Sequence, residues 1–371
     1  MKLSSLPFHI GTTEQPHNPA GLPDCLPFEV VFDERWGGLA QPRNPDLEAV
    51  LARAYALGQA FGTPLAADDF GKPYANDFLS LIQASGARQG RGLEIGAGVG
   101  YLTRRLIDEG WRMDSLEPGR GYEPFWAKYG VDVIDDYFPS ERAPGPYEMI
   151  CAYGVLEHVP DPLAFLEHLK AHLTPGGRAY LSVPDCTDEI QAADPSILFH
   201  EHLNYFDAGS LLRLLQRAGL QGRVKKSGFG RCLYAEASAK AGLQSGEPGE
   251  TGLPQEVVAS YPERCSDSTT RIRVRLGSLA NKAPLGIYCA ARGLAMLDPQ
   301  WRLRFFDDDP LQRGKYLPPF LAPIEERSRL FADPPQVVAI LSRTFGERIR
   351  DSLRADGFTG VILTIQGLAS E

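Results

Sequence analysis

The sequence predicts a doubly wound α/β fold with a small N-terminal cap and a second, smaller α/β domain at its C-terminal end. Three observations support this prediction. Short apolar segments alternate with amphipathic ones from residue 91 to about residue 220, which indicates parallel βαβ units. A glycine-rich turn follows the first of these apolar segments. A second alternation of the same kind begins after Lys282.

The length of the chain, 371 residues, predicts two or three domains. We expect an N-terminal cap, a central doubly wound domain, a linker or helical excursion poor in large apolar residues, and a smaller Rossmann-like C-terminal domain. The expected ranges are 1–75, 76–240, 241–275 and 276–371.

Hydrophobic periodicity predicts the individual elements. Before the glycine-rich turn we expect a strand at 30–32 and helices at 46–61 and 76–84. In the central domain the expected strands are 92–96, 111–118, 131–138, 147–154 and 178–184. Helices are expected at 101–110 and at 160–177, the second ended by Pro175, Gly176 and Gly177. The C-terminal domain has candidate strands within 284–297, 301–310, 335–343 and 359–365.

Composition restricts the partners of the protein. The net charge of −9 disfavours non-specific binding to nucleic acid or to an anionic membrane, because both need a basic face. No apolar run approaches the length of a signal peptide core or a membrane span. The six cysteines are scattered, which favours reduced thiols in a cytoplasmic protein. We therefore expect a small-molecule partner, and the oligomeric state stays open.

The most informative segment is the glycine-rich turn, Leu93-Glu94-Ile95-Gly96-Ala97-Gly98-Val99-Gly100. Glycines let the backbone turn sharply and let a ligand approach closely. Dinucleotide enzymes share such turns, but here a carboxylate precedes the turn and the third glycine of GxGxxG is missing. Both features favour a cofactor that carries an ammonium and a sulfonium group. About twenty residues on, Glu117-Pro118 supplies a carboxylate that can accept both hydrogen bonds of a ribose diol.

A third motif, Val155-Leu156-Glu157-His158, follows the fourth expected strand of the central domain. Together with ExGxGxG and the acidic residue after the second strand, it resembles the class I S-adenosylmethionine-dependent methyltransferases, which have a Rossmann-like fold. The resemblance covers residues 85–235 and implies S-adenosylmethionine as cofactor and S-adenosylhomocysteine as product. The alternative is that these glycines only make tight turns.

The resemblance implies a role for each residue of this site. The glycine backbone lines the methionine and ribose parts, Glu94 lies near the amino group, and Glu117 holds the ribose. Asp135 or Asp136 meets the adenine amino group or belongs to a solvated turn. His158 is structural, on the helix behind the cofactor. The expected cofactor-binding residues are Glu94, Gly96, Ala97, Gly98, Gly100, Glu117, Pro118, Asp136, Tyr153 and Gly154.

A second candidate site lies at 195–206, where two histidines, a carboxylate and aromatic residues stand close together. A metal site is disfavoured, because the HEH triplet has no third ligand nearby and is not HExxH. A structured loop with satisfied histidines is another interpretation. We favour a histidine general base oriented by a neighbouring carboxylate, since histidine titrates near the working pH.

This segment, LFHEHLNYFDAGSL, resembles the YHEHxxYF signature of sugar C-methyltransferases, which methylate nucleotide-linked deoxy-keto sugars. The resemblance implies that Glu201 and His202 are the catalytic pair, and we assign acceptor binding to Phe199, His200, Asn204 and Tyr205. Phe199 replaces the tyrosine of the family. Motifs at 288–293, 306–310 and 312–319 match the C-terminal domain of that family, with eroded glycines.

The N-terminal zinc-binding cysteines of the family are missing, with only Cys25 in that region, so we expect no bound metal. The expected function is methylation of a small molecule next to a carbonyl group, on a nucleotide-linked keto-sugar or a related secondary metabolite. O- or N-methylation by the same fold is one alternative. A non-catalytic subunit that retains the cofactor pocket is another.

Overall fold

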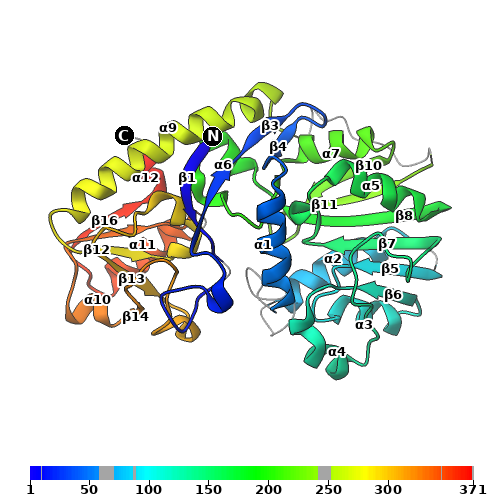
Figure 1. The fold of residues 1–371 in the computed structure, drawn as a ribbon, viewed down its shortest axis with the longest axis horizontal. Helices are drawn as coiled ribbons and strands as arrows, with labels where there is room; N and C mark the ends of the chain where they lie inside the picture. Colours follow the sequence, from blue (N-terminus) through cyan, green and yellow to red (C-terminus); the bar gives the residue numbers. More distant parts are fainter. Residues whose placement is uncertain (10, 58–70, 87–88, 241–251, 344, 370–371) are drawn as a thin grey trace. The chain divides into compact units, whose positions relative to one another are not determined.

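The computed structural model describes residues 1–9, 11–57, 71–86, 89–240, 252–343 and 345–369 (Figure 1). They form two compact units. The first, called here the central unit, comprises Val31–Ile190 and Glu201–Ala259. The second, called the C-terminal unit, comprises Met1–Val30, Gln191–His200 and Ser260–Glu371. The expected N-terminal cap is thus divided between the units, because sequence periodicity does not tell which core a segment joins.

The described part of the central unit contains a six-stranded sheet in the order β10-β11-β8-β7-β5-β6 (Figure 1). The four strands at the β6 end are parallel, and β11 and β10 continue the sheet in antiparallel pairs. Their bounds are β5 (Arg91–Ile95), β6 (Arg112–Leu116), β7 (Tyr147–Tyr153), β8 (Leu173–Pro184), β10 (Gln221–Lys226) and β11 (Cys232–Ser238). The doubly wound fold is therefore confirmed.

Helices cover both faces of this sheet. Residues of α5 and α7 pack into the core on one face, and those of α2 and α3 pack on the other. Side-chain caps fix two helix starts: Asp161 accepts a hydrogen bond from the Ala164 N–H, and Asp207 forms a capping box with Ser210. The helices are α1 (Pro45–Ala56), α2 (Lys72–Ala84), α3 (Tyr101–Asp108), α4 (Glu123–Tyr129), α5 (Pro162–Ala171) and α7 (Ala208–Arg217). A small antiparallel sheet joins β3 (Val31–Asp33), β4 (Gly38–Ala40) and β9 (Asn204–Tyr205).

Two expected elements of the central unit are wrong. The strand expected at 131–138 is reduced to one bridge between Leu116 and Ile134, because the following Asp136 bonds within a turn instead of continuing the sheet. The helix expected to reach residue 177 ends at Ala171, and residues 173–177 already belong to β8. There the Tyr147 N–H bonds the His172 carbonyl, so pairing with β7 begins before the glycines. Residues 58–61 of the helix expected at 46–61 lie outside the described residues.

The C-terminal unit contains a parallel sheet in the order β14-β13-β12-β15-β16. All four candidate strands of this region are confirmed. Residues of α9 (Gln255–Ala280) and α12 pack into the core on one face, and those of α10 and α11 pack into another cluster. The strands are β12 (Leu285–Tyr288), β13 (Leu303–Asp307), β14 (Ile324–Glu326), β15 (Val337–Ile340) and β16 (Val361–Thr364), and a hairpin adds β1 (Lys2–Pro7) and β2 (Cys25–Glu29). The helices are α10 (Arg329–Ala332), α11 (Gly346–Ala355) and α12 (Ile365–Ala369).

Helices α6 (Thr187–Ala192) and α9 (Gln255–Ala280) contain two of the points where the chain passes from one unit to the other. Much of the expected linker is therefore the long helix α9, whose inner face carries buried residues such as Tyr261 and Ile272. The short 3-10 helices are η1 (Pro19–Gly21), η2 (Arg120–Tyr122), η3 (Leu156–His158), η4 (Pro195–Ile197), η5 (Ala290–Arg292), η6 (Leu294–Met296) and η7 (Pro310–Gln312).

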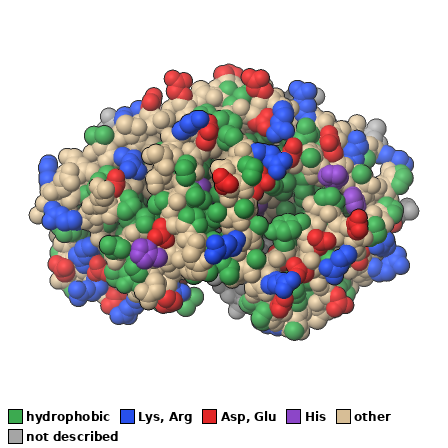
Figure 2. All heavy atoms as spheres, in the orientation of Figure 1, with side chains coloured by type: hydrophobic (Ala, Val, Ile, Leu, Met, Phe, Trp, Pro, Cys, Tyr) green, Lys and Arg blue, Asp and Glu red, His purple; other side chains and the backbone are tan. Residues whose placement is uncertain are grey.

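Two properties of the molecule bear on its partners. Among the helices of the described residues, none combines the length and the apolar character that a bilayer crossing needs. Figure 2 shows basic and acidic side chains interspersed over one face of the molecule.

Candidate active site

The glycine-rich turn after β5 has the backbone that only glycine adopts readily. Gly96, Gly98 and Gly100 have φ values of +73°, +49° and +79°. A Cβ atom at Gly96 would lie 2.5 Å from a methyl of Val155, and one at Gly100 would lie 2.6 Å from a methyl of Val131. At Gly98 a Cβ atom would meet nothing within 4 Å. The middle of the turn is therefore open to a ligand.

Glu117, directly after β6, is tied to this turn. Its Oε2 atom accepts a hydrogen bond from the Gly98 N–H at 2.8 Å, and Oε1 accepts one from the Gly119 N–H at 2.7 Å. Burial raises the pKa of Glu117, against the effect of these two bonds. Each carboxylate oxygen has two lone pairs, so both can accept a further bond from a ribose hydroxyl. Trp126 on α4 donates from Nε1 to the Gly98 carbonyl at 2.7 Å, a contact that the sequence analysis missed.

Glu94 lies deeper than expected. Its side chain is in the interior, where the Thr103 hydroxyl of α3 donates to it and in turn contacts the Ser115 hydroxyl at 2.7 Å. Burial raises its pKa to about 8. In this structure Glu94 links β5, α3 and β6, while the neighbouring Ala97 N–H, like that of Gly96, bonds the Leu116 carbonyl.

Asp135 and Asp136, in the range 131–138 where a strand was expected, make contacts within a turn. Asp136 accepts hydrogen bonds from the Tyr137 N–H at 2.8 Å and from the Ser140 hydroxyl at 2.6 Å. The bond from Ser140 lowers the pKa of Asp136. Asp135 pairs with Arg120 at 2.7 Å. Two roles were left open for these residues, a contact with the adenine amino group and a place in a turn. The structure shows hydrogen bonds and an ion pair of a turn.

The remaining residues expected at the cofactor lie at strand ends. Pro118 is half-buried beside Glu117. Gly154 follows β7 with φ +67°, and its N–H bonds the Ser182 carbonyl of β8 at 2.9 Å. Tyr153 packs its ring on Phe78 of α2, with 5.2 Å between the centroids. These residues therefore border the carboxyl end of the sheet, as the glycine-rich turn does.

The HEH triplet is divided by a bend. The chain bends at His200 and Glu201, and the two units meet in the sequence between these residues. His200 lies in the C-terminal unit between Phe8 and Phe28, at centroid distances of 5.7 and 5.6 Å, and its Nε2 is 3.3 Å from the Leu26 carbonyl. Burial lowers its pKa to about 4. His200 therefore packs among aromatic residues of the C-terminal unit.

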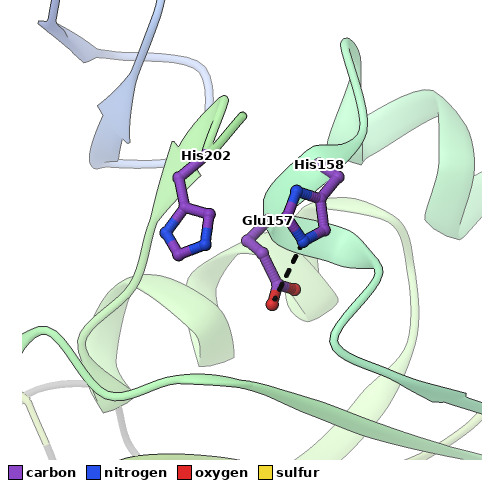
Figure 3. A group of neighbouring side chains, drawn as sticks. All are labelled: Glu157, His158 and His202. Atoms are coloured by element: carbon purple, nitrogen blue, oxygen red, sulfur yellow. Dashed lines mark ion pairs between the residues drawn. The ribbon is translucent and has the colours of Figure 1, made fainter. Parts of the chain in front are cut away.

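His202 instead meets the motif that follows β7. Its ring lies edge-on to that of His158, with 5.1 Å between centroids, and the Glu157 carboxylate lies beside the His158 ring (Figure 3). Glu157 Oε1 is 3.8 Å from His158 Nε2. His158 thus faces the candidate base. The premise that no third ligand lies near the HEH histidines is wrong for His202, because two candidates arrive from a distant part of the sequence.

Glu201 receives a hydrogen bond that the sequence analysis did not predict. The Tyr55 hydroxyl of α1 donates to Glu201 Oε1 at 2.7 Å. Burial, with the charge of Glu201, raises the pKa of Tyr55 well above its usual value, which keeps the phenol a donor. The two residues stand 146 positions apart, so no local pattern connects them.

Hydrogen bonds fix the backbone of this segment. Gln41 donates from Nε2 to the His202 carbonyl at 2.9 Å, and the His158 ring nitrogen Nδ1 lies 2.8 Å from the Glu201 carbonyl. Asn204, expected to bind the acceptor, donates to the carbonyls of Leu156 and Val159 at 3.1 and 2.7 Å. Asn204 thus links the segment that contains His202 to the segment that contains Glu157 and His158. The other expected acceptor residues, Tyr205 in β9 and Phe199 in the C-terminal unit, are buried.

Electrostatics connect the histidine site to the glycine-rich turn. Burial raises the pKa of the Tyr122 phenol, and the charges of Glu117 and then Glu201 raise it further. The phenol therefore lies within the fields of both carboxylates. Burial also raises the pKa of Glu157. For His158 burial alone would lower the pKa, but the charges of Glu157 and Glu201 outweigh it and raise the value.

The fold and the glycine-rich turn define a class of protein. Residues 69–223 match the family model described as "Methyltransferase domain". This stretch includes β5 to β8, the glycine-rich turn, Glu117 and the HEH triplet. The central unit therefore carries a Rossmann-like methyltransferase domain.

Several known proteins are similar to parts of the chain. The C-methyltransferase NovU of Streptomyces niveus is 26% identical over 135 residues, which are 35% of this chain and 32% of that protein. The ubiquinone biosynthesis O-methyltransferase of Xylella fastidiosa is 30% identical over 126 residues, which cover 30% and 47%. That of Vibrio cholerae is 24% identical over 163 residues, which cover 38% and 65%. The chain thus spans between about a third and just under two thirds of these relatives.

Among solved structures, a 1,6-didemethyltoxoflavin-N1-methyltransferase of Burkholderia thailandensis is similar in fold. It shares 18% sequence identity and a TM-score of 0.40, and the similarity covers 54% of this chain and 94% of that chain.

Proposed function

We propose that this protein is an S-adenosylmethionine-dependent methyltransferase that methylates a small molecule at a carbon next to a carbonyl group, with His202 as general base. The observation that carries the proposal is the open glycine-rich turn after β5, where the Gly98 N–H bonds the Glu117 carboxylate. The same unit of the protein also contains His202.

The residues after β5 and β6 fit the cofactor. When bound, S-adenosylmethionine supplies a methyl group on a positively charged sulfur. Gly98 leaves its side of the turn bare, and Glu117 holds the turn while keeping lone pairs for the ribose hydroxyls. Trp126 fixes the Gly98 carbonyl by a hydrogen bond from Nε1.

His202 is the base in this proposal. It takes the proton from the carbon next to the carbonyl group, and the electron pair of the broken C–H bond moves toward the carbonyl oxygen. That carbon then accepts the methyl group. Gln41 and the contact with His158 position His202, while Tyr55 fixes the direction of the Glu201 carboxylate. Most of the rate enhancement comes from this positioning and from stabilisation of the developing charge.

The acceptor class is part of the proposal. The similarity to a C-methyltransferase and the HEH segment both favour a carbon acid, such as a nucleotide-linked keto-sugar or a related secondary metabolite.

Calorimetry on the purified protein tests the cofactor half of the proposal. We expect S-adenosylmethionine and S-adenosylhomocysteine to bind with micromolar affinity or better, about 8 kcal/mol. Glu117→Ala should weaken binding by about 1.5–3 kcal/mol, the range for hydrogen bonds to a charged group. Tight binding of NAD, with no heat from either expected ligand, would contradict the assignment.

O-methylation is the second candidate, favoured by the 30% identity to an O-methyltransferase. In that case His202 deprotonates a hydroxyl group. Solvent exchange separates the two reactions: with the methyl donor absent, a carbon acid should exchange its α-proton with deuterated water, and His202→Ala should abolish the exchange. A product methyl group released by acid, with no exchange, identifies an O-methyltransferase. Cofactor binding without turnover on any acceptor would indicate the non-catalytic subunit.

A further inference from the structure

Three potential metal ligands stand together in the central unit. They are Glu157 and His158 in η3, directly after β7, and His202 in the segment before β9 (Figure 3). One ligand atom from each residue can be chosen so that all three lie within 4.8 Å of one another. The proposed function uses only one of these side chains as a base, and it gives the Glu157 carboxylate no role.

Glu157 is the first argument that this cluster has a ligand. The residue is 4% exposed, and its Oε2 atom is buried without a hydrogen-bond partner among the described residues. The other oxygen, Oε1, is 3.8 Å from His158 Nε2, which is beyond hydrogen-bond distance. A buried carboxylate with an unsatisfied oxygen is costly unless a cation or a proton donor compensates it. Figure 3 shows this carboxylate next to the His158 ring, with the His202 ring on the other side of His158 Nε2 and Glu157.

The orientation of His158 is the second argument. Its Nδ1 lies 2.8 Å from the Glu201 carbonyl, which can only accept a hydrogen bond, so Nδ1 carries the proton. In the neutral ring Nε2 then keeps its lone pair on the side of Glu157. A backbone carbonyl that fixes the tautomer and the ring direction in this way is typical of histidines that bind metals.

The ligand types select the ion. Two imidazoles and one carboxylate form a set that zinc and related divalent transition metals prefer, with further positions left for water or substrate. Magnesium and calcium prefer sets made of oxygen ligands. We propose that Glu157, His158 and His202 bind a divalent transition-metal ion of the zinc type. This proposal replaces the expectation of no metal, which rested on the missing N-terminal cysteines and on the missing third ligand near the HEH triplet.

The ligand atoms of Glu157, His158 and His202 need to move only a little to reach the distances found around a bound ion. Around a tetrahedral ion with bonds of about 2.0–2.1 Å, neighbouring ligand atoms are about 3.3 Å apart. The Glu157 and His158 atoms, at 3.8 Å, would close by about 0.5 Å. The widest pair, within 4.8 Å, would close by at most about 1.5 Å, which small side-chain rotations supply.

Metal binding and proton abstraction exclude each other at His202. An ion bound to this ring takes the lone pair that the proposed function uses to remove a proton. This consequence rests on the proposed function, whereas the binding itself does not. The test therefore uses the metal alone, without acceptor or methyl donor, so failure of one proposal is distinguishable from failure of the other.

The experiment is a titration of the full chain after treatment with a chelator and removal of the chelator. Zn(II) is followed by calorimetry, and Co(II) is followed by its visible absorption, which reports the coordination geometry. We expect one ion per chain with a Kd in the micromolar range or below, and no heat from Mg(II). Glu157→Gln, which keeps the shape of the side chain, and His158→Gln should each weaken Zn(II) binding at least tenfold.

The controls are two exposed residues on α5 of the same unit, Glu167→Gln and His168→Ala, which should bind Zn(II) like the wild type. Circular dichroism of each variant shows whether it is folded. Absence of stoichiometric Zn(II) binding to the wild type overturns the proposal. So does a folded Glu157→Gln variant with unchanged affinity.

Discussion

The two units repeat one design with different residues. Each has a wholly or mainly parallel sheet whose first strand along the chain, β5 or β12, runs into a turn with left-handed backbone. In the central unit this turn contains Gly96, Gly98 and Gly100, whereas in the C-terminal unit the left-handed position is Cys289, with φ +54°. A glycine leaves the backbone bare for a ligand, and a cysteine covers it with a side chain. The two turns therefore share left-handed backbone but differ in whether a side chain covers it.

The strand ends around the two turns differ in the same way. The second-to-last residue of the first strand is the carboxyl-bearing Glu94 in β5 and the apolar Ile287 in β12. After the second strand, Glu117 bonds the turn itself, but Asp308 is occupied by the Tyr288 hydroxyl at 2.6 Å and by Arg327 at 3.3 Å. Glu117 thus bonds the backbone of its own turn, whereas Asp308 bonds a tyrosine and an arginine side chain.

The largest effect expected from this comparison is at the two histidines on either side of the unit boundary. His202→Ala should lower turnover by about 10²–10⁴, the usual effect of losing a positioned base, and leave cofactor binding nearly unchanged. His200→Ala, in the C-terminal unit, should change turnover per folded molecule less than tenfold, and Glu201→Gln should fall between the two. Steady-state kinetics and calorimetry measure this. Equal losses at His200 and His202 would contradict the division between the units.

Glu94 should make stability depend on pH. Its folded-state pKa, about 8, is raised from 4.5, so the folded protein holds an extra proton between these values. Stability should therefore fall as pH rises from about 4.5 to about 8 and change no further above that from this group. The loss is at most about 5 kcal/mol, at about 1.4 kcal/mol per pKa unit. Glu94→Gln should remove this slope in urea unfolding measured across the pH range, whereas the exposed Glu167→Gln should retain it.

Gly96→Ala should destabilise the central unit by roughly 1–3 kcal/mol, because the new Cβ meets Val155 and φ is positive. The matched control is Gly176→Ala in β8, where a Cβ atom would meet nothing within 4 Å. The difference between their urea midpoints measures the effect. Equal stability of the two variants would mean that the turn relaxes without cost.

The smallest effect is expected at the cysteine turn. Cys289→Gly should be about 0.5–1 kcal/mol more stable than Cys289→Ala, because relief of the left-handed strain exceeds the extra chain entropy of glycine. Both variants lose the thiol, so the comparison isolates the backbone. Thermal unfolding measures the difference, and a more stable alanine variant would show that Cys289 is not strained.

Local features could be predicted from the sequence, and long-range contacts could not. The glycine-rich turn and β7 were predicted, because continuous apolar runs and glycines act within a few residues. The strand expected around Ile134 failed, because side-chain bonds of Asp136 compete with sheet pairing there. Tyr55 and Trp126 were missed, because their partners come from other elements. The bend at His200 also lacks a periodic signal, and it decides which histidine faces Glu157.

The short segment from Gln191 to His200 determines how the protein can be divided. It leaves the central unit, joins the C-terminal unit and returns directly to Glu201. Within the C-terminal unit, the buried Asp194 carboxylate pairs with Arg343, and the Asp194 carbonyl accepts a bond from the Tyr261 hydroxyl at 3.0 Å. A fragment that stops at Ala259 loses both Arg343 and Tyr261. Its Asp194 carboxylate then has no arginine partner, a few residues before His202 in the sequence. Gene fusions and domain exchanges therefore need to move the two units together, because the central unit is not one contiguous stretch of the sequence.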